Sequence, residues 1–346
     1  MVVIYHAFGP HYGYYLPWSG WFRDFKAPPS QPFLWFYPIT FGWAGVALFF
    51  VLSGFCIHLS FLRSKNFGSP RFFWRRFWRI YPAYVIALLA FCTLNRLNIF
   101  SRSGVEQFVS HALLLHNFRE STFFGIVPAF WSIATEVQLY LLFPLLLVLR
   151  SRFGIIGCII VTFSLGLFWR AVAVYRWGLA DHVITPALSS PMMTWFDWTL
   201  GAFVAERFHH GGRAFSHNRI WLSLLIPIFV ASTLYKPLTT FSFSLAATIA
   251  AIVLDAALYI PWRKHSWVTG LAFIGLISYS LYLWHQPLLY LVIPHVRHFT
   301  DSSIIAWSVL IYLMIAGSWI SFRLIELAGM DIGDSLWQRL HKPPQK

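Results

Sequence analysis

Several ionisable side chains fall inside runs of the chain that are otherwise strongly apolar. They are His6, Glu136, Asp197, Asp255 and His285. Because a charged group at the centre of a bilayer costs ~3 kcal/mol or more, each of them is a candidate functional residue. A neutral imidazole can take a proton from a hydroxyl near pH 7, so His6 is a candidate general base. Hydrogen-bonded packing is the alternative role for a single membrane histidine.

The acidic candidates differ in how closely a motif surrounds them. Glu136 lies one turn into the apolar run that opens at Trp131. Its carboxylate suits three tasks, namely pairing with a basic side chain, orienting an imidazole, or binding a coupling cation. From the residues alone we favour the structural ion pair. Asp197 and Asp255 belong to no such motif, and we expect interhelical hydrogen bonds for both.

We predict an inner loop from Arg63 to Tyr81, which is basic and aromatic and contains no acidic residue. Guanidinium groups bind phosphates in bidentate fashion and aromatic rings stack on nucleobases, so a nucleotide-bearing donor such as coenzyme A fits this composition. Anchoring at an anionic inner leaflet explains it equally well and is the simpler interpretation. The basic residues of the segment are Arg63, Lys65, Arg71, Arg75, Arg76 and Arg79.

A glycine-containing apolar stretch, GWAGVALFFVLSGF, runs from Gly42 to Phe55. Small residues such as Gly42, Gly45 and Gly54 allow helices to approach closely, so we interpret them as packing positions. Ser53 is a candidate acyl-accepting nucleophile, but no base is adjacent to it in the sequence. A hydroxyl bonded to its own helix backbone is the more common arrangement, and we expect it here.

The composition defines the surroundings of these residues. Of 346 residues, 58% are hydrophobic, 20% aromatic and 11% charged, and the mean hydropathy is +0.61. Soluble domains carry about 25% charged residues, so this composition excludes a disordered chain and a soluble globule. Apolar runs recur at roughly the 20 residues that cross a bilayer as a helix. We predict an all-α, polytopic helical membrane bundle that forms a single domain over residues 1–346.

The predicted spans number ten when an incomplete first span is counted. The apolar run from Met1 to Phe8 is under half the length of a crossing helix, so we expect truncation at the N-terminus. The loop 10–38 is rich in aromatic residues and proline, which is typical of an interfacial lid or re-entrant segment. The predicted spans are 1–9, 39–62, 82–99, 131–149, 153–173, 194–208, 220–235, 241–260, 269–293 and 304–322.

The formal net charge of +14 indicates orientation in the membrane and not a nucleic-acid partner, since lysine and arginine gather on the cytoplasmic side of polytopic proteins. Three cysteines fall in apolar runs without metal-ligand spacing, so we expect free thiols and no metal site. If the first span runs outward, seventeen of the 26 basic residues lie on inner segments and both termini are cytoplasmic. These inner residues are Arg63, Lys65, Arg71, Arg75, Arg76, Arg79, Arg150, Arg152, Arg207, Arg213, Arg219, Arg263, Lys264, Arg323, Arg339, Lys342 and Lys346.

A series of short motifs extends in order along nearly the whole chain. They are VVIYHAF from Val2, GVALFFVLSGF from Gly45, FWRRFWRIYPAY from Phe73, WSIATEVQLYLLFP from Trp131, FDWTLGAFVA from Phe196, IGLISYSLYLWHQPL from Ile274 and FRLIE from Phe322. Together they resemble the integral membrane acyltransferases of family 3, which include O-antigen and exopolysaccharide O-acetylases.

This resemblance implies an inner-membrane enzyme of ten helices with a specific direction of transfer. Its acyl group, usually acetyl, would come from cytoplasmic acyl-CoA and pass to a hydroxyl of a carbohydrate outside, as in O-acetylation of a polysaccharide or lipopolysaccharide. Acyl-CoA would be a co-substrate, with no bound cofactor. The lipid bilayer and the carbohydrate acceptor would be the other partners.

The resemblance also implies a catalytic pair. His6 matches the essential first-span histidine of the family, and Glu136 matches the acid of its Trp-Ser motif. The family usually has an arginine or lysine eleven positions before this histidine, which here falls before Met1. Val137 replaces a second acid of the family pattern, and Ala328 replaces a proline.

Binding roles are implied for two further groups of residues. Arginines before the third span match a family pair that we assign to the phosphates of the acyl-CoA donor, namely Arg76 and Arg79, with Arg75 beside them. Three residues in the matching motifs are assigned to substrate binding, namely Trp131, Tyr282 and His285.

Two other classes of function remain open from the sequence. A polytopic secondary transporter of a small or glycan-linked solute would also have about ten spans, buried acids and membrane histidines. Such transporters often show internal repeats, and no duplicated pattern is evident in this sequence. A non-catalytic assembly partner is the third hypothesis.

Overall fold

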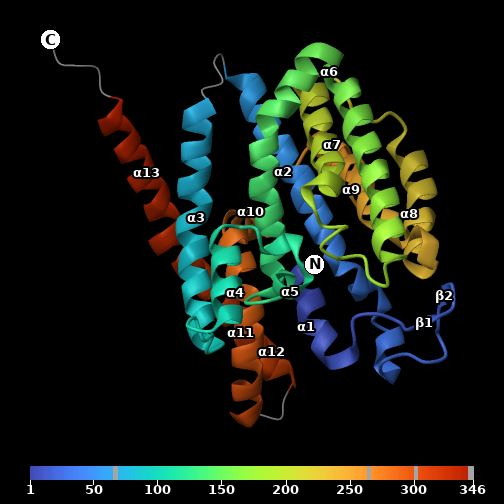
Figure 1. Ribbon diagram of the computed structural model, residues 1–346, viewed down its shortest axis with the longest axis vertical. Coiled ribbons are helices and arrows are strands. Elements are labelled where there is room, and N and C mark those ends of the chain that lie inside the picture. The colour runs from blue at the N-terminus through green and yellow to red at the C-terminus, as the bar shows by residue number, and fades with distance from the viewer. Residues whose placement is uncertain (65–68, 263–265, 300–302, 342–346) are drawn as a thin grey trace. The chain divides into compact units, whose positions relative to one another are not determined.

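Helices carry almost the whole chain in the computed structural model, which describes residues 1–64, 69–262, 266–299 and 303–341 (Figure 1). Within these residues the only strands are the short antiparallel pair β1 (Trp18–Ser19) and β2 (Phe22–Arg23). The all-α prediction is therefore confirmed. All ten predicted spans fall on helical segments, although several boundaries differ. Five of the residues predicted on the inner side lie outside the described ranges, namely Lys65, Arg263, Lys264, Lys342 and Lys346.

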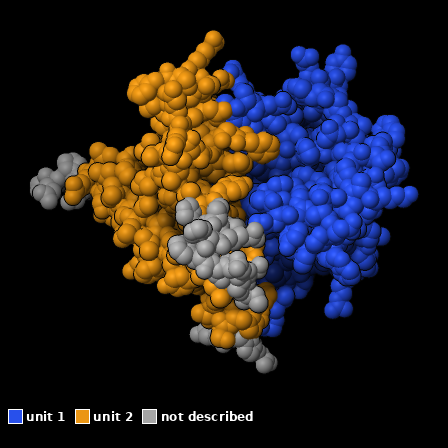
Figure 2. Space-filling view, turned by 90° about the horizontal axis from the view of Figure 1, so that it is seen from below, with its two compact units in different colours: residues 1–66, 117–123, 131–261 blue, residues 67–116, 124–130, 262–346 orange. Residues whose placement is uncertain are grey.

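The chain divides into two compact units, each built from segments that are distant in sequence (Figure 2). Unit 1 consists of residues 1–66, 117–123 and 131–261, and unit 2 of residues 67–116, 124–130 and 262–346. The prediction of a single domain stays a prediction.

Unit 1 contains most of the helices from the first two thirds of the chain. Its core is the packing of α2 against α7 and α9, and of α6 against α7. Its elements are α1 (Val2–Tyr12), β1, β2, η1 (Gln31–Leu34), η2 (Tyr37–Trp43), α2 (Ala44–Arg63), α5 (Glu120–Phe123), α6 (Trp131–Trp177), α7 (Pro191–His209), α8 (Asn218–Leu234), η5 (Lys236–Phe241) and α9 (Ser242–Leu258).

Unit 2 combines α3 with the C-terminal helices. Helix α11 packs along α12, and α13 packs along α3. The elements are α3 (Ser69–Leu94), α4 (Arg102–Ala112), η4 (Pro128–Phe130), α10 (Ser266–Leu276), α11 (Ser278–Phe299), α12 (Ser303–Ser321), the π-helical turn η6 (Phe322–Glu326) and α13 (Leu327–Leu340), while η3 (His116–Phe118) falls at a unit boundary in the sequence.

Five helical segments of the described chain are long and apolar enough to cross a membrane, or six if the pair α10 and α11 counts as one. One of them, Pro128–Trp177, is too long for a single crossing, because 50 residues of helix extend roughly 75 Å, against a hydrocarbon core of ~30 Å. Its helix α6 is broken at Gly154, whose φ of 68° is left-handed and non-helical. Figure 1 shows two separate helices meeting there. This break falls at the second residue of the predicted span 153–173, close to the end of the predicted span 131–149.

From Ser69 onward the basic segment before the third span is helical, which corrects the prediction of an inner loop from Arg63 to Tyr81 for these residues. Helix α3 begins at Ser69, thirteen residues before the predicted span. Pro70 stands in its first turn, where its missing N–H costs nothing, and arginine is a good helix former. The arginines therefore lie on turns of a regular helix.

The predicted span 269–293 is also different, because it is bent. Helix α10 and the part of α11 up to Val292 meet at an angle of 74°. Gly275 and Ser278 flank the break, and residues of these two types are common at sharp kinks. Apolarity is uniform across the bend, so a hydropathy pattern could not locate it.

Close backbone contact joins α2 to α7. A Cβ atom added at Gly54 would lie 2.0 Å from the carbonyl oxygen of Trp198, and one at Gly201 would lie 1.9 Å from the carbonyl oxygen of Val51. Only glycine fits at such a distance. The interpretation of Gly54 as a packing residue is therefore correct, and Gly201 is its counterpart on the facing helix.

Glycines also allow close packing of α1. A Cβ atom at Gly42 would lie 2.4 Å from Cβ of Tyr5, and one at Gly45 would lie 2.9 Å from a methyl carbon of Val2. Glycines at the start of the second span thus allow the first helix to pack directly on it.

The segment 10–38 is tied to the rest of unit 1 by Arg23. Its buried guanidinium donates to the carbonyl oxygens of Leu16 (2.6 Å), Thr233 (3.3 Å) and Asp181 (3.3 Å). The Trp18 ring centroid lies 3.6 Å from its central carbon. Burial lowers the pKa of Arg23 below its usual value. The segment predicted as a lid is thus held by polar contacts that span 210 residues.

We predict that Gly201→Ala lowers the melting temperature of the purified protein by several degrees, because overpacking of this kind costs ~1–3 kcal/mol. Gly270→Ala in α10 is the matched control, since a Cβ atom there meets nothing within 4 Å. Thermal unfolding in detergent measures both. A Gly201→Ala protein as stable as the wild type would contradict the close packing of α2 and α7.

Candidate active site

The Glu136 carboxylate is buried in unit 1, where it is 5% exposed. It accepts a hydrogen bond from the Ser53 hydroxyl of α2 at 3.1 Å and another from Tyr140, one turn along α6. The Trp198 indole N–H of α7 in turn donates to Ser53 Oγ at 3.2 Å. The expectation that Ser53 bonds its own helix backbone is therefore wrong. Three helices place a hydroxyl, a phenol and an indole around one carboxylate.

His6 lies on α1, the helix that packs on η2 and the start of α2. Its imidazole is partly exposed and lies 5.3 Å from the ring of Tyr5, centroid to centroid. The Tyr5 hydroxyl is fixed by a 2.6 Å hydrogen bond to the Tyr15 hydroxyl. Both members of the predicted catalytic pair thus belong to unit 1, and the pairing of the imidazole with Glu136 stays a prediction.

Trp131 opens α6 and is 3% exposed. Its ring stacks on Phe123 with centroids 5.8 Å apart and also contacts Phe50 and Phe243 edge-on. The structure therefore gives this ring a packing role in an aromatic cluster. A contact with substrate stays a prediction.

The three predicted donor-binding arginines share one side of α3. Arg75 and Arg79 are four residues apart and exposed, and Arg76 is partly exposed over the ring of Phe72 at 5.7 Å. Glu326 of η6, which is 3% exposed, is an electrostatic partner of Arg79. This side of α3 presents closely spaced guanidinium groups that can bind several phosphate oxygens.

Helix α11 carries the other two predicted binding residues, and both are engaged inside unit 2. The Tyr282 hydroxyl donates to the carbonyl oxygen of Ala129 at 2.8 Å. His285 is fully buried, and its Nδ1 lies 2.7 Å from the carbonyl oxygen of Tyr282. Because a carbonyl only accepts, Nδ1 carries the proton and Nε2 of the neutral ring is an acceptor. Neighbouring Tyr279 donates to the carbonyl of Ile80 at 2.9 Å, so this stretch fastens α11 to α3 and η4.

The predicted site residues consequently fall into two groups, one in each unit. Unit 1 holds the predicted acid–base residues and unit 2 holds the predicted donor-binding residues. In unit 1 they are His6, Trp131 and Glu136, and in unit 2 they are Arg75, Arg76, Arg79, Tyr282 and His285.

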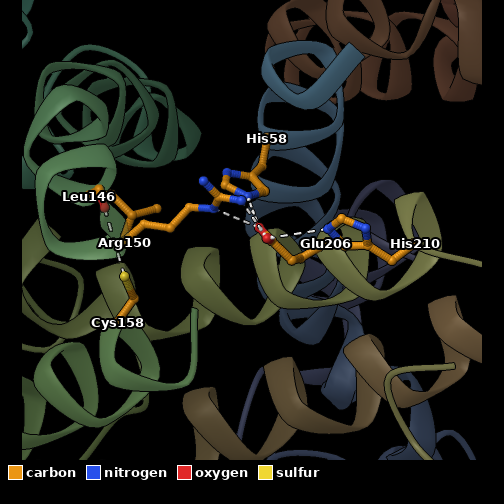
Figure 3. A network of polar contacts seen from close by, with 6 residues as sticks. All are labelled: His58, Leu146, Arg150, Cys158, Glu206 and His210. Atoms are coloured by element: carbon orange, nitrogen blue, oxygen red, sulfur yellow. Dashed lines mark hydrogen bonds and ion pairs between the residues drawn. The ribbon is translucent and has the colours of Figure 1, made fainter. Parts of the chain in front are cut away.

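An ionic network in unit 1 was missed by the sequence analysis (Figure 3). Glu206 of α7 accepts from His58 Nε2 of α2 at 2.7 Å and from Arg150 of α6 through Nε at 2.8 Å and Nη2 at 2.5 Å. His210 lies one turn on, with its Nε2 3.8 Å from the carboxylate. The sequence does show one indication of it, since Glu206 is an acidic residue in the last turn of an apolar run. Arg150 was predicted only as a charge on the inner side of the membrane.

The two remaining membrane acids have structural partners. Asp197 is 1% exposed on α7, and its electrostatic partner is Arg170 of α6. Neither of its carboxylate oxygens has a hydrogen-bond partner among the described residues, so the expected interhelical hydrogen bond is not observed. Asp255 accepts from the backbone N–H of Ala214 at 2.8 Å and of Phe215 at 3.4 Å. The expectation of an interhelical bond is wrong for Asp255, because its carboxylate holds the loop that joins α7 to α8.

A second missed feature is a stacked histidine pair in unit 2. The rings of His111 and His116 are nearly parallel, with centroids 3.9 Å apart, and both residues are fully buried. Burial lowers the pKa of His111 to about 4 and that of His116 to about 3, so both rings are neutral near pH 7. The Tyr84 hydroxyl donates to the His111 carbonyl at 2.9 Å. The pair is therefore part of the core between α3 and α4.

Among the described residues, no group of three or more His, Cys, Asp or Glu side chains is placed to hold a metal ion. Cys56, Cys92 and Cys158 form no disulfide.

Comparison with known proteins gives a match over nearly the whole chain. The family model described as an acyltransferase domain matches residues 1–323. Nodulation protein 10 of Rhizobium leguminosarum bv. viciae is 24% identical over 349 residues, which cover 88% of this chain and 87% of that protein.

Two further relatives have names that state an activity. The putative membrane-bound transacylase BcsY of Komagataeibacter xylinus is 27% identical over 84% of this chain and 77% of its own length. The peptidoglycan O-acetyltransferase OatA of Listeria monocytogenes is 25% identical over 84% of this chain and 52% of its own length. No solved structure matches the chain.

We predict that Arg150→Ala lowers the melting temperature, because Glu206 loses two hydrogen bonds from a charged donor, each worth ~1.5–3 kcal/mol before screening at this partly exposed site. Arg152→Ala, at an exposed position two residues away, is the matched control and should melt like the wild type. Equal melting temperatures for the two variants would show that the network contributes nothing to stability.

Proposed function

We propose that this chain, which belongs to the acyltransferase family and is a multi-pass membrane enzyme, transfers an acyl group from cytoplasmic acyl-CoA to a carbohydrate hydroxyl across the membrane. The observation that carries the proposal is the family match over residues 1–323. The acetyl group is the simplest acyl group for this reaction, and OatA, named as a peptidoglycan O-acetyltransferase, supports a carbohydrate acceptor.

In the proposed reaction, the His6 imidazole removes the proton of the acceptor hydroxyl as its oxygen attacks the thioester carbonyl. The C–S bond breaks, the ester C–O bond forms, and the thiolate leaves with the proton as free coenzyme A. The buried Glu136 carboxylate would stabilise the transient imidazolium, and Ser53 and Tyr140 hold that carboxylate in place.

The exposed guanidinium groups of α3 would bind the donor. Arg75, Arg76 and Arg79 are spaced for several phosphate oxygens, and positioning the thioester against the hydroxyl can supply a large part of the rate. A thioester is already activated toward attack, so the proposed reaction needs only proton transfer from the acceptor hydroxyl and positioning of the two substrates.

The proposed orientation places both termini on the cytoplasmic side of the inner membrane. The distribution of lysine and arginine supports it, and it brings the arginines of α3 to the side where acyl-CoA is made. Membership of an acyltransferase family favours this enzyme over the transporter and the assembly-partner hypotheses.

We predict that His6→Ala and Glu136→Gln each reduce acyl transfer by about 10²–10⁴-fold at equal protein levels, the usual contribution of general acid–base catalysis. The measurement uses inside-out vesicles, labelled acetyl-CoA and recovery of label in lumenal glycan. His11→Ala, at a partly exposed position on the same helix, is the control and should retain activity. Wild-type transfer by the His6→Ala protein would refute the proposed base.

We further predict that Arg76→Ala combined with Arg79→Ala raises the KM for acetyl-CoA by about tenfold or more, because hydrogen bonds to charged groups are worth ~1.5–3 kcal/mol each. The KM for the acceptor should stay unchanged. Arg339→Ala, an exposed arginine on α13, is the control. An equal rise in both KM values would indicate that the arginines act only on the fold.

A further inference from the structure

A pocket of ≈ 250 Å³ lies within unit 2, where the end of α3 meets the segment 125–128 and the middle of α11. Its wall includes the aromatic rings of Phe91 and Tyr290 and the side-chain amides of Asn95 and Gln286. Apart from Tyr290, none of the described residues that line it is ionisable. The pocket therefore suits an uncharged ligand.

The two amides have capacity left for such a ligand. Asn95 uses its Nδ2 to donate to the carbonyl oxygen of Ile126 at 2.8 Å, and Gln286 uses its Oε1 to accept from the N–H of Ala129 at 2.9 Å. An amide side chain carries both an acceptor oxygen and an NH₂ donor. Asn95 thus retains an acceptor and Gln286 a donor, which together match a hydroxyl group.

The position of the pocket along α3 separates it from the donor-binding arginines. Arg76 stands near the start of this helix and Leu94, which lines the pocket, at its end. Eighteen residues of helix extend about 27 Å, close to the ~30 Å of a hydrocarbon core. The pocket and the arginines therefore lie toward opposite ends of a helix that is long and apolar enough to cross a membrane.

We propose that this pocket is the subsite for one sugar ring of the acceptor. The inference rests on the proposed function, which requires the acceptor to arrive from the side opposite to acyl-CoA. The volume falls below the ~300–1,000 Å³ typical of sites for drug-sized ligands, so it suits a single ring and not an oligosaccharide. An aromatic ring and two amides give a ring of this kind one apolar face and hydroxyl partners.

A lipid chain is the competing occupant, and the amides argue against it. A hydrocarbon chain would offer no hydrogen-bond partner to the acceptor of Asn95 or to the donor of Gln286, whose side chain is buried. The two amides therefore favour a hydroxylated ligand in this subsite.

The kinetic test fills the pocket. Leu94→Trp places a larger ring at its edge, while Leu89→Trp is the matched control on the same helix, since Leu94 and Leu89 are 48% and 49% exposed and Leu89 does not line the pocket. We expect Leu94→Trp to raise the KM for the acceptor by tenfold or more without changing that for acetyl-CoA. Leu89→Trp should match the wild type. An unchanged acceptor KM, or a rise for acetyl-CoA instead, would overturn the subsite.

A second variant tests the hydrogen bonding without removing the anchor. Gln286→Glu keeps an oxygen to accept from Ala129 and removes the NH₂ donor, so the acceptor KM should rise. Because this side chain is buried, the melting temperature of the variant is measured beside that of the wild type. A wild-type acceptor KM for this variant would show that the donor does not contact the sugar.

A binding readout separates failure of the subsite from failure of the proposed function. A diazirine derivative of N-acetylglucosamine and a diazirine fatty acid are cross-linked separately to the purified full chain. We expect the sugar probe to label residues 125–128 or 286–291, and Leu94→Trp to block this labelling. Labelling by the fatty acid alone, or sugar labelling elsewhere, would overturn the subsite. Specific sugar labelling in a wild-type protein that transfers no acyl group would refute the proposed function and leave the subsite standing.

Discussion

The close approach of α2 and α7 is the constraint on which the polar interior of unit 1 depends. Two glycines on facing helices, Gly54 and Gly201, bring each backbone against a carbonyl of the other. In a bilayer the lipid is as apolar as the side chains, so helices associate through packing and polar contacts. The same approach brings Trp198 within hydrogen-bond distance of Ser53, and Glu206 within that of His58.

The helices could be predicted from sequence because apolarity is what a bilayer demands, and all ten predicted spans fall on helical segments. Five or six segments of the described chain are long and apolar enough to cross, and the predicted spans 1–9, 194–208 and 220–235 are not among them. The ends of the helices and the bends within them were harder to predict. Helix α3 continues through a basic segment that hydropathy excludes, because arginine is a good helix former in water. The bend between α10 and α11 interrupts no apolar run. A hydropathy profile indicates whether a helix lies in lipid or in water, but it does not indicate where the helix axis changes direction.

The candidate site shows a similar limit. Glu136 could be identified from its cost in the membrane, but its partner Ser53 lies 83 residues away, and the acid of the missed network, Glu206, lies 148 residues from His58. Neither pairing produces a local sequence pattern, because each joins residues on different helices that meet only in the folded protein. The residues that the resemblance implied, including Tyr282 and His285, have clear packing contacts in the structure, so residue type alone does not separate a structural role from a functional one.

The buried guanidinium of Arg23 has a consequence for the order in which the protein is made. Two of its three acceptors, the carbonyl oxygens of Asp181 and Thr233, are synthesised 158 and 210 residues later. At the ribosome's pace of about 5–20 residues per second, Thr233 follows after roughly 10–40 s. Throughout that interval the guanidinium lacks these two native acceptors and has only the carbonyl oxygen of Leu16. The segment around Arg23 therefore completes its native contacts only after α8 has been synthesised.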